Sequence, residues 1–527
     1  MKRYILCLLL LLCILSVCIG CQENSSGRHE NTGSDSLQSE QVVTDDGRIE
    51  IAYRVCDTGG GRLEGWVSQH GTPGEQAGVP VRAIPALGYT FTGWSDGIAD
   101  AERHDIFGSQ DQTVTANFSF DRRELPIMSV TTVTGKDVTS KENYIGATVS
   151  LCNTGNTKYE MSGISAGIRG RGNATWTYEK KSYRIRFEQK QQPLGLGSAP
   201  DRTWVLMANH CDQSLMRNAL AIDLANRLDG IDFNSSAAHV ELYLNGEYRG
   251  VYLLVEQIQV DAARVDIGEE EPGYDPMAVD AGFLVELDSY SEPPYEFRIH
   301  DKRYQVKSEV RSDEQFDYIR DYIAAVDDAV RSGSKEQFEA LVDLDSFIDG
   351  YLLEEYLKNI DVGWSSFYMY KKPGGKMILG PFWDFDLAAG NDHRLDNGSS
   401  DGLYAGRYRR GFDQYHPWFT ALTQHDWFAE AVVSRWQQIG VYLDENIAFL
   451  DSMTAAAPQA FNRNFEKWHI FGQRINQEPE HIMALDSWEE HADALRDWLI
   501  DRRAWLDECL SSTDSFSSAA QSQFGRH

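Results

Sequence analysis

Two aspartates in the second half of the chain have the residue type and spacing needed for phosphoryl-transfer chemistry. Asp361 lies in the segment KNIDVGWSSFYMYKK, and Asp384 lies in GPFWDFDLAAGN. A loop aspartate can accept the proton of a substrate hydroxyl, and a second aspartate can hold Mg²⁺ beside the phosphates of a nucleotide. Between them, two strand-like runs at 367–372 and 377–383 are joined by a Pro-Gly-Gly turn, which predicts a β-hairpin.

This order of parts favours a kinase-like catalytic centre, because protein kinases also place a hairpin between the catalytic loop and the metal-binding aspartate. Asp386 is a second candidate metal ligand, although in an extended segment it would face away from Asp384. Kinases carry an asparagine five residues after the catalytic aspartate, and this position is Ser366 here. Asn391 is the candidate replacement ligand, with a turn or helix-cap role as the favoured alternative.

The first 21 residues have the pattern of a bacterial lipoprotein signal. Two basic residues precede an apolar stretch at 4–19, and the sequence Cys18-Ile19-Gly20-Cys21 resembles a lipobox. This predicts lipidation of Cys21, with an ordinary cleaved signal as the alternative. No later segment has the length and apolar character of a membrane span. We therefore expect an extracytoplasmic protein that is attached to the bacterial membrane or cell surface only through its lipid.

The formal net charge of −31 argues against nucleic acid and anionic membranes as partners. It favours basic substrates or cations, while an acidic solvated surface is the alternative explanation. Four cysteines follow the signal region, and their scattered spacing neither forms a zinc motif nor identifies disulfide pairs. They are Cys56, Cys152, Cys211 and Cys509.

Composition divides the remaining chain into several regions. Residues 22–47 are polar and poor in apolar side chains, which predicts a disordered tether, and the Ser-rich residues 511–527 predict a disordered tail. Residues 48–120 are Gly-rich with short β-like runs, which predicts a small β-rich domain. Within that region, GYTFTGWSDG followed by DQTVTANF resembles a divergent internalin-type repeat. The resemblance implies a compact, β-grasp-like spacer or adhesion module.

From residue 125 onward the pattern becomes mixed α and β. The run 240–258 contains Asn-Gly, a strong hairpin signal, and 282–288 predicts another strand. Ser312 and Gln315 form a capping-box pattern before a helix that ends at a glycine, and Asp345 is the predicted cap of the next helix. The region 418–510 is expected to be mainly helical, with its tryptophans in the core.

Several ordered motifs in residues 125–510 resemble the CotH kinase family. They are GIRGRGNATWTYEKKSYRIRF, WVLMANHCDQSLMRNALAIDLANRL, VELYLNGEYRGVYLLVEQI and the two aspartate segments. The resemblance implies an α+β, atypical protein-kinase-like domain with a helical C-terminal part. It also implies phosphorylation of Ser or Thr in protein substrates, with ATP and Mg²⁺ or Mn²⁺ as cofactors. Asp361 would be the catalytic residue and Asp384 a metal ligand.

Four further residues are candidates for the nucleotide site. Lys181 and Arg171 lie in the first motif and are expected near the triphosphate, with Glu256 as a partner of Lys181 by analogy with ordinary kinases. Arg217 is a fourth phosphate candidate. A solvated lysine and a helix-surface salt bridge are the alternatives for Lys181 and Arg217.

A non-catalytic role is the second hypothesis. A lipoprotein outside the cell meets little ATP, so the kinase-like scaffold could instead serve binding or adhesion at the cell surface. Binding alone does not require Asp361 and Asp384, and their presence favours the enzyme.

Overall fold

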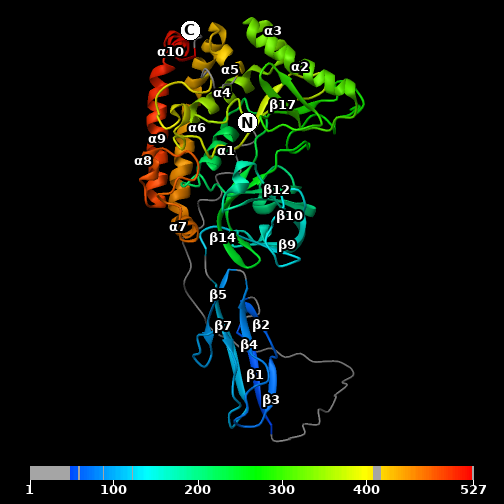
Figure 1. Cartoon of the computed structure of the whole chain (residues 1–527), viewed down its shortest axis with the longest axis vertical. Helices are drawn as coiled ribbons and strands as arrows, with labels where there is room; N and C mark the ends of the chain where they lie inside the picture. The colour runs from blue at the N-terminus through cyan, green and yellow to red at the C-terminus, as the bar shows by residue number, and fades with distance from the viewer. Residues whose placement is uncertain (1–47, 57–59, 87, 121–122, 408–416, 525–527) are drawn as a thin grey trace, which may run out of the picture.

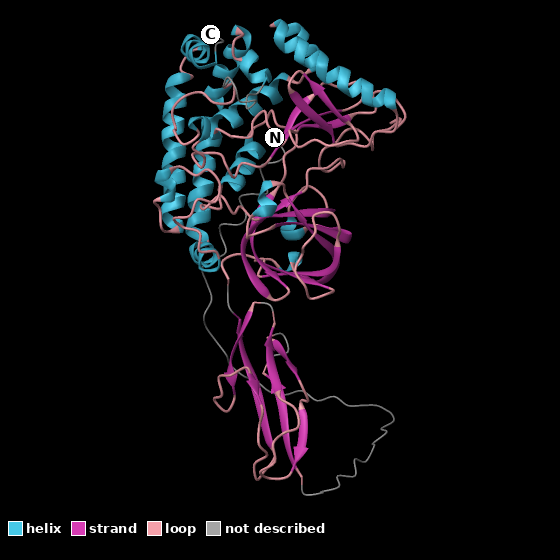
Figure 2. Ribbon diagram, viewed as in Figure 1, coloured by secondary structure: helices cyan, strands magenta, loops and turns pink. Residues whose placement is uncertain are grey.

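The structure is a computed structural model that describes residues 48–56, 60–86, 88–120, 123–407 and 417–524. The predicted lipidation site, Cys21, and the predicted tether lie outside the described residues. Figure 2 shows strands at one end of the molecule, a barrel in the middle and most of the helices at the other end.

The N-terminal unit consists of strands and turns. One sheet has the order β3-β1-β7-β5 and the other β2-β4-β6 (Figure 1). Alternate side chains such as Ile51, Tyr53 and Val114 are buried between them with Trp94. The β-rich prediction is therefore confirmed, while the β-grasp comparison stays a prediction. The strands are β1 (Ile49–Val55), β2 (Gly61–Glu64), β3 (Ser68–Gly71), β4 (Val81–Pro85), β5 (Tyr89–Trp94), β6 (Glu102–Arg103) and β7 (Gln112–Phe120).

A closed barrel follows, with the strand order β10-β11-β12-β14-β13-β8-β9. Its strands alternate, so that Val149, Ile168 and Ile185 fill the interior while the residues beside them face outward. The predicted hairpin is confirmed, since Asn245 and Gly246 have φ angles of 54° and 81° in the turn between β13 and β14. The strands are β8 (Ile127–Thr132), β9 (Ile145–Cys152), β10 (Met161–Arg171), β11 (Ser182–Gln191), β12 (Asp201–Met207), β13 (Ala237–Leu244) and β14 (Glu247–Glu256).

A second sheet lies next along the chain, with the order β16-β17-β15-β18-β19 and antiparallel pairs throughout. Its last two strands form the hairpin that the sequence predicts between the two aspartates. The predicted strand at 282–288 is also confirmed and lies at the centre of the sheet. The strands are β15 (Phe283–Leu287), β16 (Glu296–Ile299), β17 (Lys302–Val306), β18 (Phe367–Lys371) and β19 (Ile378–Phe382).

Helices make up most of the remaining chain. One of them, α1 (Arg217–Arg227), interrupts the barrel sequence between β12 and β13. The others are α2 (Asp313–Ser332), α3 (Lys335–Leu341), α4 (Leu344–Leu357), α5 (Pro417–Leu422), α6 (Asp426–Ala456), α7 (Pro458–Lys467), α8 (Glu480–Met483), α9 (Trp488–Cys509) and α10 (Thr513–Phe524). Four short 3-10 helices occur in the described loops: η1 (Thr157–Tyr159), η2 (Ala174–Thr177), η3 (Pro193–Gly195) and η4 (Arg394–Asp396).

Local capping signals set the ends of α2 and α4. The Ser312 side chain accepts a hydrogen bond from Gln315 N (3.2 Å), and Gly333 ends α2 in the left-handed conformation, as predicted. The predicted cap of α4 is wrong by two residues. Asp343, rather than Asp345, accepts a hydrogen bond from Ser346 N (2.9 Å), because the helix begins at Leu344, two residues earlier than predicted.

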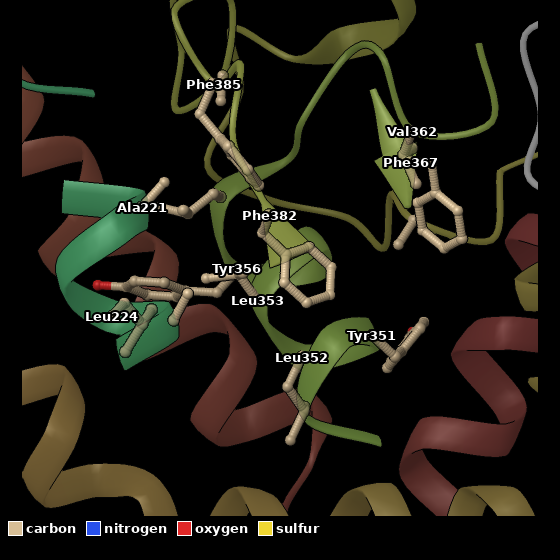
Figure 3. Close-up of a cluster of buried hydrophobic side chains, with 14 of the residues drawn as sticks. Ala221, Leu224, Tyr351, Leu352, Leu353, Tyr356, Val362, Phe367, Phe382 and Phe385 are labelled. Atoms are coloured by element: carbon tan, nitrogen blue, oxygen red, sulfur yellow. The ribbon is translucent and has the colours of Figure 1, made fainter. Parts of the chain in front are cut away.

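The largest core surrounds α4, which is buried on nearly all sides. Figure 3 shows Tyr351, Leu352 and Tyr356 of α4 among side chains from α1 and from the β18–β19 hairpin. All six predicted core tryptophans pack in or against the same cluster: Trp436, Trp488 and Trp498 are buried members, and Trp427, Trp468 and Trp505 pack against it. This dense core fixes the end of α4, from which the chain continues to Asp361.

The predicted disordered tail is wrong for the described residues up to 524. These residues form α10, whose Phe516, Ala520 and Phe524 are buried. The three side chains recur every four residues, so they share one helix face that packs on the core. Serine enrichment concealed this apolar stripe.

In the described part of the chain, no helix has both the length and the apolar character needed to cross a membrane. The four cysteines there, Cys56, Cys152, Cys211 and Cys509, all have free thiols.

Candidate active site

Asp361 lies in a turn directly after α4. Lys358 takes a left-handed conformation (φ 47°) and ends the helix. Asp361 N then donates to Asn359 Oδ1 (3.1 Å), and Trp364 N donates to Asp361 O (2.8 Å). These two hydrogen bonds hold the backbone of the turn, so that the Asp361 carboxylate is presented by a fixed loop rather than by the helix itself.

Asp384 follows β19 and also has a left-handed backbone, with a φ of 72°. Ser366 (φ 59°) lies immediately before β18, and its Oγ donates to Asp384 Oδ2 (3.1 Å). Ser366 N in turn donates to Glu286 Oε1 (2.9 Å). Two left-handed, non-glycine residues in contact are costly, and such strain persists where neighbouring contacts enforce a functional geometry. Ser366 therefore orients Asp384.

Asp361 and Asp384 line the same cavity, which has a volume of about 290 Å³. One wall comes from the barrel, including the loop after β10 and the segment between β12 and α1. The opposite wall comes from β15, from the segment that begins β18 and from the residues after β19. The lining includes Arg171, Asn173, Tyr178, His210, Glu286, Asp288, Lys307, Asp361, Ser366, Asp384, Asp386 and Asn476.

Asp386 lines this cavity too, contrary to the expectation that it faces away from Asp384. That expectation assumed an extended segment, but the chain leaves β19 at Phe382 and is no longer a strand at these residues. The Cys211 thiol donates to Asp386 Oδ2 (3.0 Å), which fixes this carboxylate against the barrel side of the cavity.

Burial and neighbouring carboxylates raise the pKa values of Asp361 and Asp386. Burial first, and then the charges of Asp384 and Asp386, raise the pKa of Asp361 to about 8. Burial followed by the charge of Asp384 raises the pKa of Asp386 to about 7. Three acidic groups thus share a space that contains too little positive charge to balance them, which makes the cavity a favourable place for a cation.

Comparison with known proteins identifies two families in this chain. Residues 168–506, which include the barrel from the end of β10 onward, the cavity and most of the helices, match the family described as CotH kinase protein. The chain belongs to the CotH kinase protein family. Residues 53–122 match the divergent InlB B-repeat domain. No curated protein matches the chain.

Arg171 is the one phosphate candidate from the CotH resemblance that the structure places in the cavity. Its guanidinium lies 4.6 Å from the centre of the Trp383 ring, and the charges of Asp384 and Asp386 act on it. The adjacent Gly172 has a φ of 95°, and a Cβ there would lie 2.0 Å from Thr175 Oγ1. Only glycine fits this turn, and Gly172 is itself one of the residues that line the cavity.

The predicted pair of Lys181 and Glu256 does not form. Lys181 Nζ donates to Trp176 O (2.7 Å), whereas Glu256 accepts from Ser236 N (2.8 Å) and lies 3.5 Å from Arg264 Nε. Neither residue lines the cavity. The reason is strand register, because β12 pairs Glu256 with Trp204, which is far along the strand from the end near Lys181.

Arg217 is also not a phosphate ligand in this structure. It is buried, pairs with Asp212 (2.6 Å) and donates to the carbonyl oxygens of Ala388 (2.9 Å) and Ala389 (3.1 Å). Its guanidinium therefore holds the segment after Asp386 onto α1. This role is structural, and it places Arg217 behind the cavity rather than in its lining.

The sequence interpretation missed a second cation, Lys307. Lys307 lines the cavity and pairs with Glu286 (2.7 Å), with Asp288 at 3.4 Å. Glu286 interrupts the otherwise apolar strand β15. An acidic residue in a buried strand needs a charged or hydrogen-bonding partner, so its presence indicates that one lies nearby. The partner lies just after β17, so only the pairing of β15 with β17 reveals it.

The residues present suit a divalent metal that is shared with a nucleotide. Among the described residues, no group of three or more His, Cys, Asp or Glu is arranged to hold a metal ion by itself. A kinase-type metal takes further oxygens from the phosphates, so Asp384 and Asp386 would be its protein carboxylates. Asn391 Nδ2 donates to Asp386 O (2.7 Å), while its buried Oδ1 has no hydrogen-bond partner in the described structure. Asn391 is not among the residues that line the cavity, so its predicted metal role stays a prediction.

Proposed function

We propose that this CotH-family chain is a protein kinase that transfers the γ-phosphate of ATP to Ser or Thr of a protein acceptor. The observation that carries the proposal is the convergence of Asp361, Asp384 and Asp386 on one cavity whose lining also includes the basic residues Arg171, Lys180 and Lys307. Buried acidic groups with raised pKa values reduce stability, so a purely adhesive surface has no physical reason to collect them.

In the proposed reaction, the acceptor oxygen forms a bond to the γ-phosphorus, and the bond from that phosphorus to the ADP oxygen breaks. Asp361 orients the acceptor hydroxyl and takes its proton, while the electron pair of the broken bond leaves with ADP. Bound Mg²⁺ or Mn²⁺, held by Asp384 and Asp386 with Asn391 nearby, would neutralise charge on the phosphates.

The chain's other residues in the cavity have positioning roles. Ser366 holds the Asp384 carboxylate through its hydroxyl, and Arg171, which lines the cavity from the barrel side, would attract the phosphates. Lys307 supplies a second positive charge that Glu286 keeps in place. The two walls thus present cations and carboxylates to the same ligand, as phosphoryl transfer requires.

We further propose that the protein acts outside the cytoplasmic membrane, attached through a lipid on Cys21. The signal-like residues 1–21 support this location. The match of residues 53–122 to a repeat domain supports a spacer role for the N-terminal unit. Its acceptor would then be a protein of the cell envelope, and nucleic acid is not an expected partner.

The test measures phosphate transfer directly. The full chain is incubated with Mg²⁺ or Mn²⁺ and labelled ATP, beside Asp361→Asn and Asp384→Asn. We expect both substitutions to lower incorporation of label into the chain or a Ser-containing acceptor by about 10²–10⁴-fold, since each removes a group that acts on the reacting atoms.

The matched control is Asp328→Asn, which makes the same chemical change at an exposed position on α2. This control should label like the natural chain. Equal labelling of all four proteins would reject the roles of Asp361 and Asp384, and no labelling of the natural chain with any acceptor would reject the enzyme.

A further inference from the structure

A basic groove runs from the active-site cavity along the outside of the barrel. Arg171 lines both the cavity and an adjoining hollow of about 320 Å³. Arg169 and Arg184 line this hollow and also a further, outer hollow of about 540 Å³. Arg186 and Arg202 line the outer hollow. We call these five arginines and the surface between them the basic groove.

Strand alternation builds this groove. Ile168 and Ile185 point into the barrel, so Arg169 on β10 and Arg184 on β11 point outward. The two arginines are directly paired across the strands, and Arg186 lies two residues further along, opposite Thr203 of β12. The cations therefore form a row that leads away from Arg171.

These arginines form no close ion pairs in the described structure. No carboxylate of the described residues lies within ion-pair distance of any of the five, in a chain with a net charge of −31. The Arg184 Nε is buried without a hydrogen-bond partner. The groove also contains three carboxylates, but Asp261 pairs with Lys190 and Asp201 lies 3.6 Å from Arg264, which leaves Glu142.

Like charges held in a row repel one another, and a bound anion relieves that repulsion. The burial of Arg184, followed by the charges of its neighbours Arg169, Arg171 and Arg186, lowers the pKa of its guanidinium. The groove is therefore strained by its own charge in the free protein and complementary to a negatively charged ligand.

We propose that the basic groove binds an acidic stretch of the protein acceptor and delivers a hydroxyl next to that stretch to Asp361. This inference rests on the proposed function and names its substrate class. Side chains on one face of an extended peptide recur about every 7 Å, which is also the spacing of alternate arginines along β11. An extended segment with alternating Asp or Glu therefore matches Arg184 and Arg186.

The nucleotide does not account for the whole groove. Arg171 is paired with Ser182, and Arg186 is four residues further along β11, a distance of roughly 13 Å on a strand. Beyond its phosphates ATP offers only an uncharged nucleoside, which does not require a row of guanidinium groups. Nucleic acid carries charge beyond the groove and would meet the acidic surface of the molecule, whereas a short acidic stretch carries charge only where the arginines are.

Binding is tested without relying on catalysis. Fluorescence anisotropy measures the affinity of the full chain for a labelled Ser peptide flanked by alternating Glu, and for the same peptide with Lys in place of Glu. We expect the Glu peptide to bind more tightly and Arg186→Glu to weaken its binding by about tenfold, the loss of one charge-assisted contact. Arg298→Glu, at an exposed arginine on β16 outside the groove, is the matched control and should bind like the natural chain.

Three results would overturn the proposal. They are equal affinity for the Glu and Lys peptides, no effect of Arg186→Glu, and tighter binding of a single-stranded oligonucleotide that is also lost in Arg186→Glu. Arg186→Ala is a second variant, used if charge reversal disturbs folding, and circular dichroism verifies the fold of each protein.

The kinetics of phosphate transfer show whether the basic groove binds the acceptor or the nucleotide. With the Glu peptide, Arg186→Ala should raise KM for the peptide several-fold and leave KM for ATP unchanged. A rise in KM for ATP instead would assign the groove to the nucleotide and overturn the proposal. If the natural chain transfers phosphate to no acceptor, the proposed function fails, and the anisotropy results still decide whether the groove binds acidic peptide.

Discussion

At the scale of single residues, the cavity contains groups that destabilise the free protein. Asp361 and Asp386 are acidic groups whose pKa values rise because burial and neighbouring carboxylates disfavour their charged forms. Ser366 and Asp384 both adopt left-handed backbone conformations beside them. A cation that enters the cavity would add charge that balances these groups, so the free protein is under electrostatic and conformational strain.

Asp361→Asn should stabilise the free protein in a pH-dependent way. An unfolded Asp has a pKa of about 4, and the folded value is about 8. The folded chain therefore binds more protons than the unfolded chain over this window, and natural stability falls as pH rises through it. In EDTA, urea denaturation should show little difference between the two proteins at low pH and a gain of roughly 1–2 kcal/mol for the variant at pH 8. A variant that is less stable than the natural protein at pH 8 would contradict the conclusion that the charged Asp361 destabilises the free protein.

Arg217 tests whether a buried cation near the site supports structure or binds phosphate. Arg217→Ala leaves the buried Asp212 without its ion-pair partner, so we expect a loss of about 3–5 kcal/mol in the free energy of unfolding. Thermal denaturation measures this loss. Arg171→Ala is the comparison, and it should keep most of the stability while weakening ATP binding. A stable Arg217→Ala protein with a selective rise in KM for ATP would restore the original phosphate role.

At the scale of elements, local patterns were predictable and long-range register was not. The hairpin before Asp384 and the Ser312 cap depend on residues close in sequence, and both were predicted correctly. The Lys181 and Glu256 pair failed because it depends on how β11, β12 and β14 align, which a single sequence does not show. The placement of Asp361, Asp384 and Arg171 in one cavity agrees with the motifs, whereas Lys307 becomes visible only through strand pairing.

Helix α10 was not predicted from its Ser-rich composition, and its packing on the core can be tested. Phe516 is fully buried against the helical core, and its replacement by Ala should cost about 3–5 kcal/mol. Urea denaturation measures the change. Ser518→Ala, at an exposed position on the same helix, is the control and should change stability by less than about 0.5 kcal/mol. An unchanged midpoint for Phe516→Ala would mean that the helix does not pack on the core in solution.

At the scale of the whole molecule, the N-terminal unit and the barrel have separate sheets. No strand among the described residues up to 120 pairs with a strand of the barrel, and each unit has its own buried core. This organisation is typical of domains that fold independently. The spacer role proposed for the first unit requires such independence.

A shortened chain that begins at Arg123 should therefore fold and keep its activity. Starting there retains Glu124, whose carboxylate accepts from Ala460 N (2.7 Å) and ties the first barrel segment to α7. We expect a thermal midpoint within a few degrees of that of the full chain and unchanged KM for ATP. A shortened protein that unfolds, or loses transfer while folded, would show that the first unit supports the cavity.

The walls of the cavity are contributed by segments that lie far apart along the chain, from Arg171 in the barrel to Asn476 after α7. During synthesis the ribosome releases these segments in order, and Asn476 is among the last parts of the site to emerge. A nascent chain is therefore without a complete pocket until translation is nearly finished. The proposed phosphate transfer would therefore begin only after nearly the whole chain has been made.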